Sequence, residues 1–308
     1  MSYRHHLRMK HNTYPWSDFL GKIYDSFIKT ASDCVNWLIF EGYKVLMRKP
    51  PVRRQPTHIR DQKYILSFSG GKDSTYLLLE LIRRGYPLDE VVFFDTGWEF
   101  PAMYEHVERC RRLCERYGIA FVTLYPKKPF DYWMFDHETR SGKRGYSWCG
   151  GPCRWGTTLK LQALDKYAEE NSNAIVYIGI AADEPERLER EFADYKRFPL
   201  ADWGVTEEEC LRGCYERGFY WDGMYEHLDR LSCKFCKNKN LKELRNIRHY
   251  YPDVWDELKY YQSRTDRPYK GEGKDVFDLD RRFAIEDRHL ASGQSITSRQ
   301  FYESLKGE

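Results

Sequence analysis

The stretch that decides the fold is Tyr64-Ile65-Leu66-Ser67-Phe68-Ser69-Gly70-Gly71-Lys72-Asp73-Ser74. Its first half is a short apolar run, typical of a buried strand, and it ends in a Ser-Gly-Gly turn. After the turn, apolar residues recur at helical spacing, and Gly85 stands where a helix would end. A strand, a glycine turn and a helix start expose backbone N–H groups at the positive end of a helix dipole. The stretch therefore predicts a phosphate-binding loop.

The side chains of this loop fit the same purpose. Lys72 adds a cation, and Ser69 and Ser74 add hydroxyl donors. The loop lacks the spacing of a Walker A sequence. It resembles instead the pyrophosphate loop of the adenine nucleotide alpha-hydrolase (PP-loop) superfamily. The resemblance implies that ATP or a related adenine nucleotide binds at Ser69, Gly70, Gly71, Lys72, Asp73 and Ser74.

Composition indicates a folded cytoplasmic protein that does not contact a membrane. The 308 residues are 41% apolar, enough for a core, and no apolar run approaches the ~18 residues of a membrane span. Residues 1–10 are polar and basic, without the apolar centre of a signal peptide. The nine cysteines therefore read as thiols or metal ligands rather than a disulfide framework.

The front of the chain is more basic than the rest. Residues 1–63 hold 12 Lys and Arg against 5 Asp and Glu, a balance of +7, whereas the whole chain carries +3. Residues 17–46 have the apolar stripe of one amphipathic helix, and 47–63 form a basic, proline-rich linker. This front end is compatible with a nucleic acid or protein partner, including a second copy in a homodimer. A solvated helix and linker is an equally good interpretation.

From residue 64 onward, strand and helix patterns alternate. Strands are predicted at 64–68, 91–94, 120–124 and 174–180, and helices at 104–117 and 157–170. This predicts an α/β fold with a doubly wound, mainly parallel sheet, in which ligands bind beyond the carboxyl ends of the strands. The expected organisation is an N-terminal helical extension (1–46), the linker (47–63), a nucleotide-binding domain (64–205), a helical cysteine-containing region (206–261) and a polar C-terminal tail (262–308).

Four segments, taken in order, resemble the phosphoadenosine phosphosulfate (PAPS) reductase family over about residues 64–260. They are Ser-Gly-Gly-Lys-Asp-Ser at 69–74, Asp-Thr-Gly-Trp-Glu-Phe-Pro at 95–101, Arg-Trp-Gly-Thr-Thr-Leu-Lys at 154–160 and Tyr-Lys-Arg-Phe-Pro-Leu-Ala-Asp-Trp at 195–203. The resemblance implies an adenine-nucleotide-binding, doubly wound sheet with an acidic residue near the nucleotide.

Individual site residues are assigned from this resemblance and from their chemistry. Asp95 at a strand end suits Mg²⁺ or a ribose hydroxyl, and Thr96 and Gly97 follow it. Arg154, Lys160 and Arg187 suit phosphate or sulfate oxygens, with surface ion pairs as the alternative. Gly179 and Asp183 lie where the family places substrate-facing residues. The candidate catalytic residues are Lys72, Asp73, Asp95 and Lys160.

Two close cysteine pairs, Cys149 with Cys153 and Cys233 with Cys236, have metal-ligand spacing. If the fold brings them together, they offer four thiolates. A [4Fe–4S] cluster is the first interpretation, as in some relatives of the resembled family, with structural Zn²⁺ second and unligated thiols third. The family cysteine expected just before Thr157 is Gly156 here. The pairs Cys110/Cys114 and Cys210/Cys214 lie on predicted helices and read as buried apolar residues.

Three functions remain open from the sequence. The first is an enzyme that cleaves ATP between its α- and β-phosphates to activate a substrate, in nucleic acid modification or sulfur transfer. The second is a PAPS or APS reductase, which the family resemblance supports. The resembled reductases use a tail cysteine as nucleophile, and no cysteine follows Cys236 here. The third is a nucleotide-binding regulatory subunit without turnover.

Overall fold

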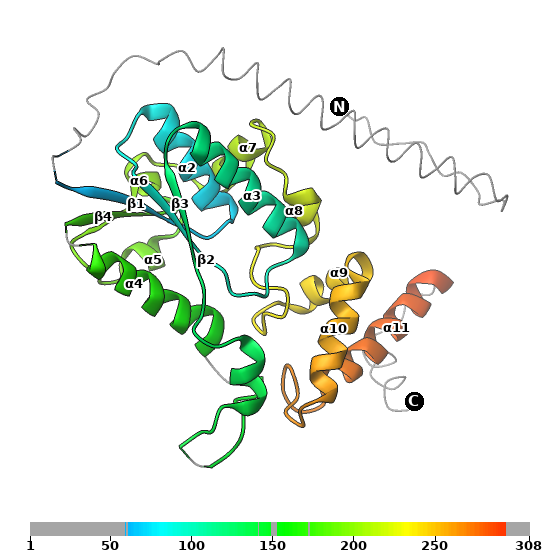
Figure 1. The fold of residues 1–308 in the computed structure, drawn as a ribbon. Coiled ribbons are helices and arrows are strands. Elements are labelled where there is room, and N and C mark those ends of the chain that lie inside the picture. The colour runs from blue at the N-terminus through cyan, green and yellow to red at the C-terminus, as the bar shows by residue number, and fades with distance from the viewer. Residues whose placement is uncertain (1–58, 60, 141, 149–152, 172, 294–308) are drawn as a thin grey trace.

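The computed structural model describes residue 59 and the ranges 61–140, 142–148, 153–171 and 173–293 (Figure 1). The predicted helix over 17–46 and nearly all of the linker lie outside these residues. Within the described ranges, no helix has the length and apolarity needed to cross a membrane.

The core of the molecule is a five-stranded parallel sheet in the order β3-β2-β1-β4-β5. Its strands are β1 (Lys63–Phe68), β2 (Glu90–Phe94), β3 (Ala120–Leu124), β4 (Ala174–Ile178) and β5 (Lys196–Arg197). The chain builds outward from β1 to β3, then crosses back to place β4 on the other side of β1. The predicted doubly wound parallel sheet is confirmed. Its topological switch point lies between β1 and β4, where such folds bind ligands.

Helices cover both faces of the sheet. Figure 1 shows α2 (Lys72–Arg84), α3 (Pro101–Arg116) and α7 (Glu207–Tyr215) on one side, and α4 (Lys160–Glu170) and α5 (Pro185–Leu188) on the other. The remaining short elements are the π-helical turns η1 (Tyr132–Asp136) and η2 (Arg154–Leu159), α6 (Pro199–Asp202), the 3₁₀ turn η3 (Trp221–Gly223) and α8 (Met224–His227).

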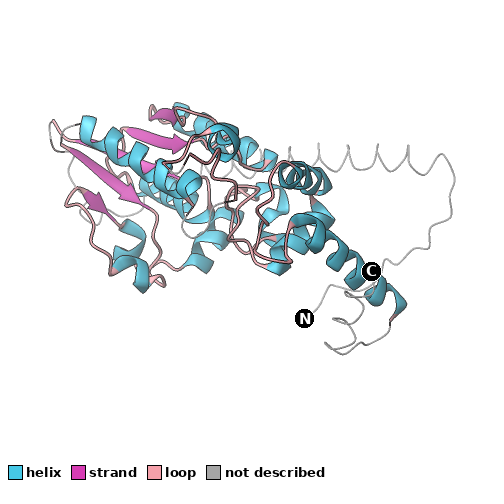
Figure 2. Ribbon diagram, turned by 90° about the horizontal axis from the view of Figure 1, so that it is seen from below, coloured by secondary structure: helices cyan, strands magenta, loops and turns pink. Residues whose placement is uncertain are grey.

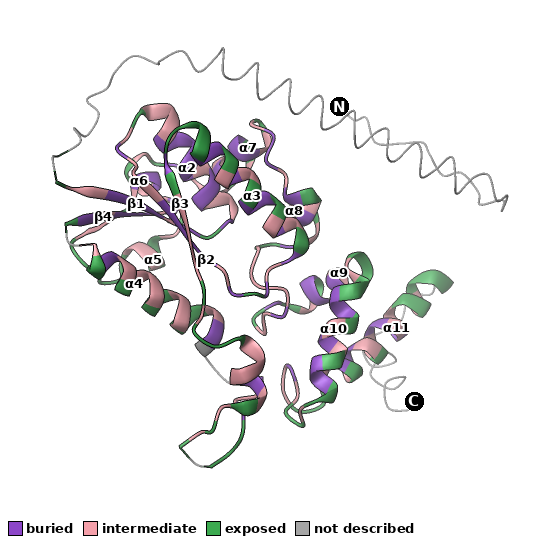
Figure 3. Ribbon diagram, viewed as in Figure 1, coloured by how far each residue is buried: buried purple, intermediate pink, exposed green. Residues whose placement is uncertain are grey.

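Alternation along the strands explains why helices lie on both faces. Leu66 and Phe68 belong to the large core cluster that includes α2 and α3, whereas Ile65 packs in a smaller cluster with Ala168 of α4 and Val176. Successive strand residues point to opposite faces, so a strand apolar at every position is buried on both sides. Figure 3 shows this burial along the central strands.

The C-terminal part contains more structure than the sequence predicts. Residues 262–308 are predicted as a polar tail, but α11 (Val276–Ser292) lies within them and packs near α9 (Leu241–Tyr250) and α10 (Pro252–Ser263). Figure 2 shows this helical region beside the sheet. Asp275 caps α11, and Val276, Leu279 and Phe283 are buried although charged residues stand between them. The dense charges hide the helical stripe in the sequence, and they form cross-helix pairs such as Arg248–Asp280.

One buried ionic cluster ties α2 to the segment after α7. The Glu80 side chain is 1% exposed and contacts Arg83 at 2.6 Å, Arg84 at 2.8 Å and Arg217 at 2.6 Å. Burial raises the pKa of Glu80, but hydrogen bonds from Arg83 and Arg84 and the charge of Arg217 lower it more, so the net pKa falls below its usual value. A lowered folded-state pKa means that this stabilisation is present at neutral pH and is lost as the pH falls through that value.

We predict that Glu80→Gln lowers the free energy of unfolding by about 3 kcal/mol, because it leaves three buried or half-buried guanidinium groups without their carboxylate. Urea denaturation at neutral pH measures the change. The matched control is Glu108→Gln on α3, whose side chain is 51% exposed in its pair with Arg111. This control should lose under about 1 kcal/mol. Equal losses in the two variants would contradict a structural role for the Glu80 cluster.

Candidate functional site

The loop Ser69–Ser74 joins β1 to α2 at the switch point of the sheet. Gly70 has φ +79°, and a Cβ there would lie 2.6 Å from Sδ of Met103. Gly71 is the N-cap of α2, with φ −75° and ψ 172°, and as a glycine it supplies no side-chain cap. Apart from the Lys72 N–H, which donates to the Tyr225 hydroxyl, the first N–H groups of α2 are able to bind an anion, as they do in phosphate-binding loops.

Hydroxyl groups fix the shape of the loop. Oγ of Ser69 lies 3.0 Å from Oγ of Ser74, which also accepts from the Ser69 N–H at 3.2 Å. The Ser74 hydroxyl reaches the Gly71 carbonyl at 3.1 Å, and the Gly71 N–H donates to Ser69 at 3.3 Å. The two serines thus hold the glycine turn closed in this structure, so little reorganisation is required when a ligand binds.

Lys72 is held by carboxylates. Its Nζ lies 2.9 Å from Oε1 of Glu207 and 3.1 Å from Oδ1 of Asp73, and its side chain is only 13% exposed. Burial lowers the pKa of Lys72, but the charges of Asp73 and Glu207 and their hydrogen bonds raise it more, so the net pKa lies above its ordinary value. Lys72 is therefore a charged ammonium group at the loop, paired with anionic groups that a phosphate is able to replace.

Two residues that sequence patterns do not single out also contact the loop. Nε1 of Trp221 donates to the Gly70 carbonyl at 2.7 Å, and the Tyr225 hydroxyl accepts from the Lys72 N–H at 2.8 Å. The backbone between them is unusual, because Trp221, Asp222 and Gly223 have φ of 50°, 51° and 76°. Left-handed conformations cost energy for residues other than glycine and cluster at functional sites. Only the Asp222-Gly223 pair offered a sequence signal, that of a turn.

The segment after β4 lies beside the loop. A Cβ at Gly179 would lie 3.0 Å from the Ser74 nitrogen, so only glycine lets the strand end and the helix start approach this closely. Asp183 accepts from the Glu207 N–H at 3.0 Å, which places it next to the partner of Lys72. Arg187 is paired with Glu184 at 2.5 Å. Gly179 and Asp183 therefore lie at or next to the loop, whereas Arg187 is found in a local ion pair.

Asp95 lies at the carboxyl end of β2, the strand beside β1. Its Oδ1 accepts from the Gly97 N–H at 2.7 Å and from the Tyr104 hydroxyl at 2.9 Å. Thr96 donates to Glu99 at 2.8 Å, and Gly97 has φ +74°. These bonds orient the Asp95 carboxylate within a tight turn. Its second oxygen makes none of these bonds.

Three of the four predicted metal-ligating cysteines line one small cavity of about 40 Å³: Cys153, Cys233 and Cys236. The fourth, Cys149, lies outside the described residues, as does the Arg154 side chain. The Gly156 N–H donates to Sγ of Cys153 at 3.2 Å. The Lys234 N–H donates to the Trp98 carbonyl at 2.8 Å, so the Cys-x-x-Cys turn is docked on the segment that follows Asp95.

The surroundings of these cysteines suit a thiolate-ligated group. Lys239 is 1% exposed, and Lys160 interacts electrostatically with Glu99 and Cys233. Burial lowers the pKa of both lysines, and the neighbouring acidic groups and thiols oppose that effect. Buried cations and an N–H donated to sulfur are features that stabilise metal-bound thiolates. Within the described ranges, no three His, Cys, Asp or Glu side chains are arranged as a metal site.

Four further cysteines of the described residues lie in the core. Cys110, Cys114, Cys210 and Cys214 are each 0% exposed. Burial raises the pKa of Cys110 and of Cys214 well above its usual value, so these thiols stay neutral. Their prediction as small apolar residues agrees with this burial.

Comparison with known proteins identifies the domain. Residues 63–207 match the phosphoadenosine phosphosulfate reductase domain. These residues include the loop, Asp95 and the whole parallel sheet. Residues 63–207 therefore form a domain of the PAPS reductase type.

The individual relatives share 30% or less of their aligned residues with this chain. An uncharacterized protein of Methanocaldococcus jannaschii is 29% identical over 260 residues, which are 77% of this chain and 49% of that protein. This chain thus spans about half the length of that relative. The tRNA-specific 2-thiouridylase MnmA 1 of Bacteroides fragilis is 30% identical over 112 residues, 36% of this chain and 30% of that enzyme. The structure of the U34-tRNA thiolase NcsA from Methanococcus maripaludis, with its [4Fe-4S] cluster, aligns over 82% of this chain and 80% of its own, with 14% identity and a TM-score of 0.38.

We predict that anaerobically purified protein contains iron or zinc, and that Cys233→Ser and Cys236→Ser each lose most of it, because removing one thiolate leaves an incomplete ligand set. Elemental analysis measures the metal. An absorption band near the violet end that is lost on acid treatment identifies an iron–sulfur cluster rather than zinc. Cys114→Ala, in the core, is the control and should keep its metal. Metal-free wild-type protein after anaerobic purification would refute the prediction.

Proposed function

We propose that this protein is a PP-loop enzyme that binds ATP at Ser69–Ser74 and cleaves it between the α- and β-phosphates, activating a substrate by adenylation. One observation carries the proposal. The N-terminus of α2, which its glycine N-cap leaves without a side-chain cap, and the charged Lys72 lie at the same loop, at the switch point of a doubly wound sheet. The match of residues 63–207 to a domain of nucleotide-binding enzymes supports it.

In this proposal, each residue has a role that follows from its position in the site. The loop N–H groups, Ser69 and Ser74 hold the departing pyrophosphate, and Lys72 neutralises its growing negative charge. Asp95, with one carboxylate oxygen outside its internal hydrogen bonds, suits Mg²⁺ or a ribose hydroxyl at the next strand end. Asp73 keeps Lys72 in place before ATP binds. Catalysis then rests on positioning and charge stabilisation rather than on a protein nucleophile.

The cysteine cavity suggests the nature of the acceptor chemistry. Cys149, Cys153, Cys233 and Cys236 would hold a [4Fe–4S] cluster, or Zn²⁺ in its place, which supplies a soft centre with affinity for sulfur. Lys160 lies between this cavity and the nucleotide side, since it interacts with both Cys233 and Glu99. It suits stabilisation of negative charge on a substrate that spans the two sites. We therefore assign the protein to sulfur transfer or nucleic acid modification.

A PAPS or APS reductase is the second candidate, and the matched reductase domain favours it. The reaction products distinguish the ATP-cleaving enzyme from the reductase. Incubation with ATP labelled at the α-phosphate, in the presence of an acceptor, gives AMP and pyrophosphate under the proposed function. Incubation with labelled PAPS and reduced thioredoxin gives sulfite under the alternative. Sulfite release at catalytic rates would replace the proposal.

We predict that Lys72→Ala weakens ATP binding by about 1–3 kcal/mol, the range for losing a charge-assisted contact. Titration calorimetry of the purified protein measures the affinity. The control is Lys166→Ala on α4, whose side chain is 65% exposed and pairs with Glu170. It should leave affinity unchanged. Unchanged affinity in Lys72→Ala would remove this loop from the nucleotide site.

We predict the opposite sign for Glu207→Gln, which should tighten ATP binding by about 0.5–1 kcal/mol. This carboxylate competes with phosphate for Lys72 and adds a negative charge beside the loop. Glu216→Gln is the control, because Glu216 directly follows the same helix and pairs only loosely with Arg212, at 4.0 Å. Weaker binding in Glu207→Gln would show that Glu207 orients Lys72 for ATP instead of competing with it.

A further inference from the structure

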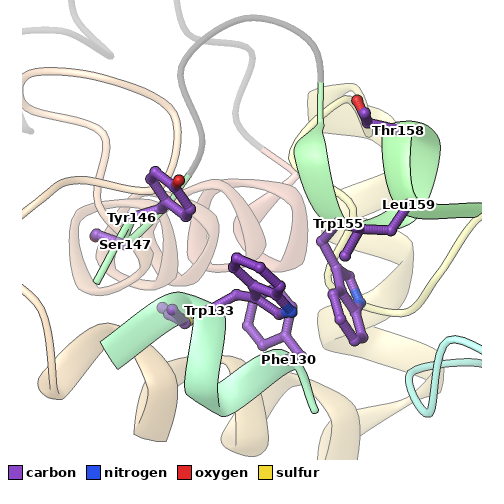
Figure 4. A pocket seen from close by; sticks show the side chains of 8 residues that line it. Phe130, Trp133, Tyr146, Ser147, Trp155, Thr158 and Leu159 are labelled. Atoms are coloured by element: carbon purple, nitrogen blue, oxygen red, sulfur yellow. The ribbon is translucent and has the colours of Figure 1, made fainter. Parts of the chain in front are cut away.

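A cavity of about 290 Å³ lies next to the cysteine cavity. Four aromatic side chains, Phe130, Trp133, Tyr146 and Trp155, line it (Figure 4). Phe130 and Trp155 also line the cysteine cavity, so the two spaces share a wall. Among the described residues, none of those predicted to bind the nucleotide lines this cavity. The cavity is therefore a separate site, placed against the cysteines.

The backbone holds the walls of this cavity in place. The Tyr146 N–H donates to the Trp133 carbonyl at 2.9 Å, which joins the hairpin that ends there to η1. Gly145 has φ +67°, and a Cβ there would lie 2.1 Å from the Met134 carbonyl oxygen, so this join requires glycine. The rings of Trp133 and Tyr146 are nearly parallel, at 13°, with centroids 6.3 Å apart. The pocket is thus formed without a ligand.

Two hydrogen-bond donors in the pocket wall stand out. Nε1 of Trp133 and Nε1 of Trp155 are both buried, and neither has a hydrogen-bond acceptor among the described residues. Trp155 is 3% exposed as a whole. A buried indole N–H normally finds an acceptor. These two nitrogen atoms are covered by protein, so the cavity offers a ligand the faces of the aromatic rings that line it, which indicate a ligand with a flat ring.

Exposed cations flank the pocket. Lys127 and Lys128 precede η1, and Arg140, Lys143 and Arg144 lie in the hairpin before Tyr146. All five are exposed, and within the described part of the chain none of them forms an ion pair with an acidic side chain. The same stretch, 127–146, has three acidic residues, so its balance is +2. A ring-binding pocket whose lining segments carry exposed cations suits a base whose neighbouring backbone carries phosphates.

We propose that this pocket binds a base of single-stranded nucleic acid. The aromatic faces stack on the base, and the exposed cations of the segments that line the pocket contact flanking phosphates. A paired base would have to leave its stack to enter. That this base is also the activated substrate rests on the proposed function, whereas its binding in the pocket does not.

Photocrosslinking tests the pocket directly. A short single-stranded oligonucleotide with one 5-iodouracil is irradiated with the full-length protein, and the modified residues are mapped by mass spectrometry. We expect adducts on Trp133, Tyr146 or Trp155. Adducts confined to residues outside the pocket would overturn the proposal.

Affinities separate base stacking from general charge attraction. Trp133→Ala should weaken binding of the single strand about tenfold or more, and Trp133→Phe, which keeps a ring but removes the N–H, should weaken it less. A strand with an abasic site at its centre should bind the wild type less well. Tyr125→Ala, 68% exposed and outside the pocket, is the control. Equal binding of the single strand by Trp133→Ala and wild type would refute the pocket.

Two further experiments identify the ligand and test whether its binding is independent of ATP binding. Free AMP should not displace the strand, and duplex should bind more weakly. Displacement by AMP, or a preference for duplex, would show that the pocket is not a single-strand site. Lys72→Ala should bind the strand as the wild type does, so loss of ATP binding and loss of strand binding report different sites.

Discussion

The start of α2 must approach the end of β4 to within backbone contact, and the rest of the site depends on this constraint. A Cβ at Gly179 would lie 3.0 Å from the Ser74 nitrogen. Because Gly179 has no side chain, the helix begins directly at the switch point. Its first N–H groups then lie where the sheet leaves a crevice. The positions of the serine hydroxyls and Lys72 are set by that placement.

The charges around this crevice are organised in two groups. Lys72 with Glu207 and Asp73 forms one at the loop, and the cysteines with Lys160 and Lys239 form the other. The segment from Asp95 to Phe100, which follows β2, contacts the second group, because Glu99 interacts with Lys160 and the Trp98 carbonyl accepts from the Lys234 N–H.

The sequence predicts those parts of the molecule whose signals are local. The sequence predicts the loop, the four longer strands and α2 with its end at Gly85, because the signal for each lies in neighbouring residues. It does not predict the roles of Trp221 and Tyr225, because their contacts with Gly70 and Lys72 join residues about 150 positions apart. The aromatic pocket likewise needs the hairpin folded onto η1. The polar-tail prediction for 262–308 was wrong where α11 forms, because cross-helix ion pairs there resemble solvated charges in sequence.

The short helix α8 contacts both the loop and α9. One side of this four-residue helix contacts the loop through Tyr225, and the other meets α9, where the His227 ring stacks on Tyr250 at 3.6 Å and the His227 carbonyl accepts from Asn246. Only Glu226 separates the two contacts, so α8 links the loop to α9 through nearly adjacent residues. A ligand that displaces Tyr225 would therefore also disturb the stacking of His227 on Tyr250. By thermodynamic reciprocity, a partner that shifts α9 would change the affinity of the loop for that ligand.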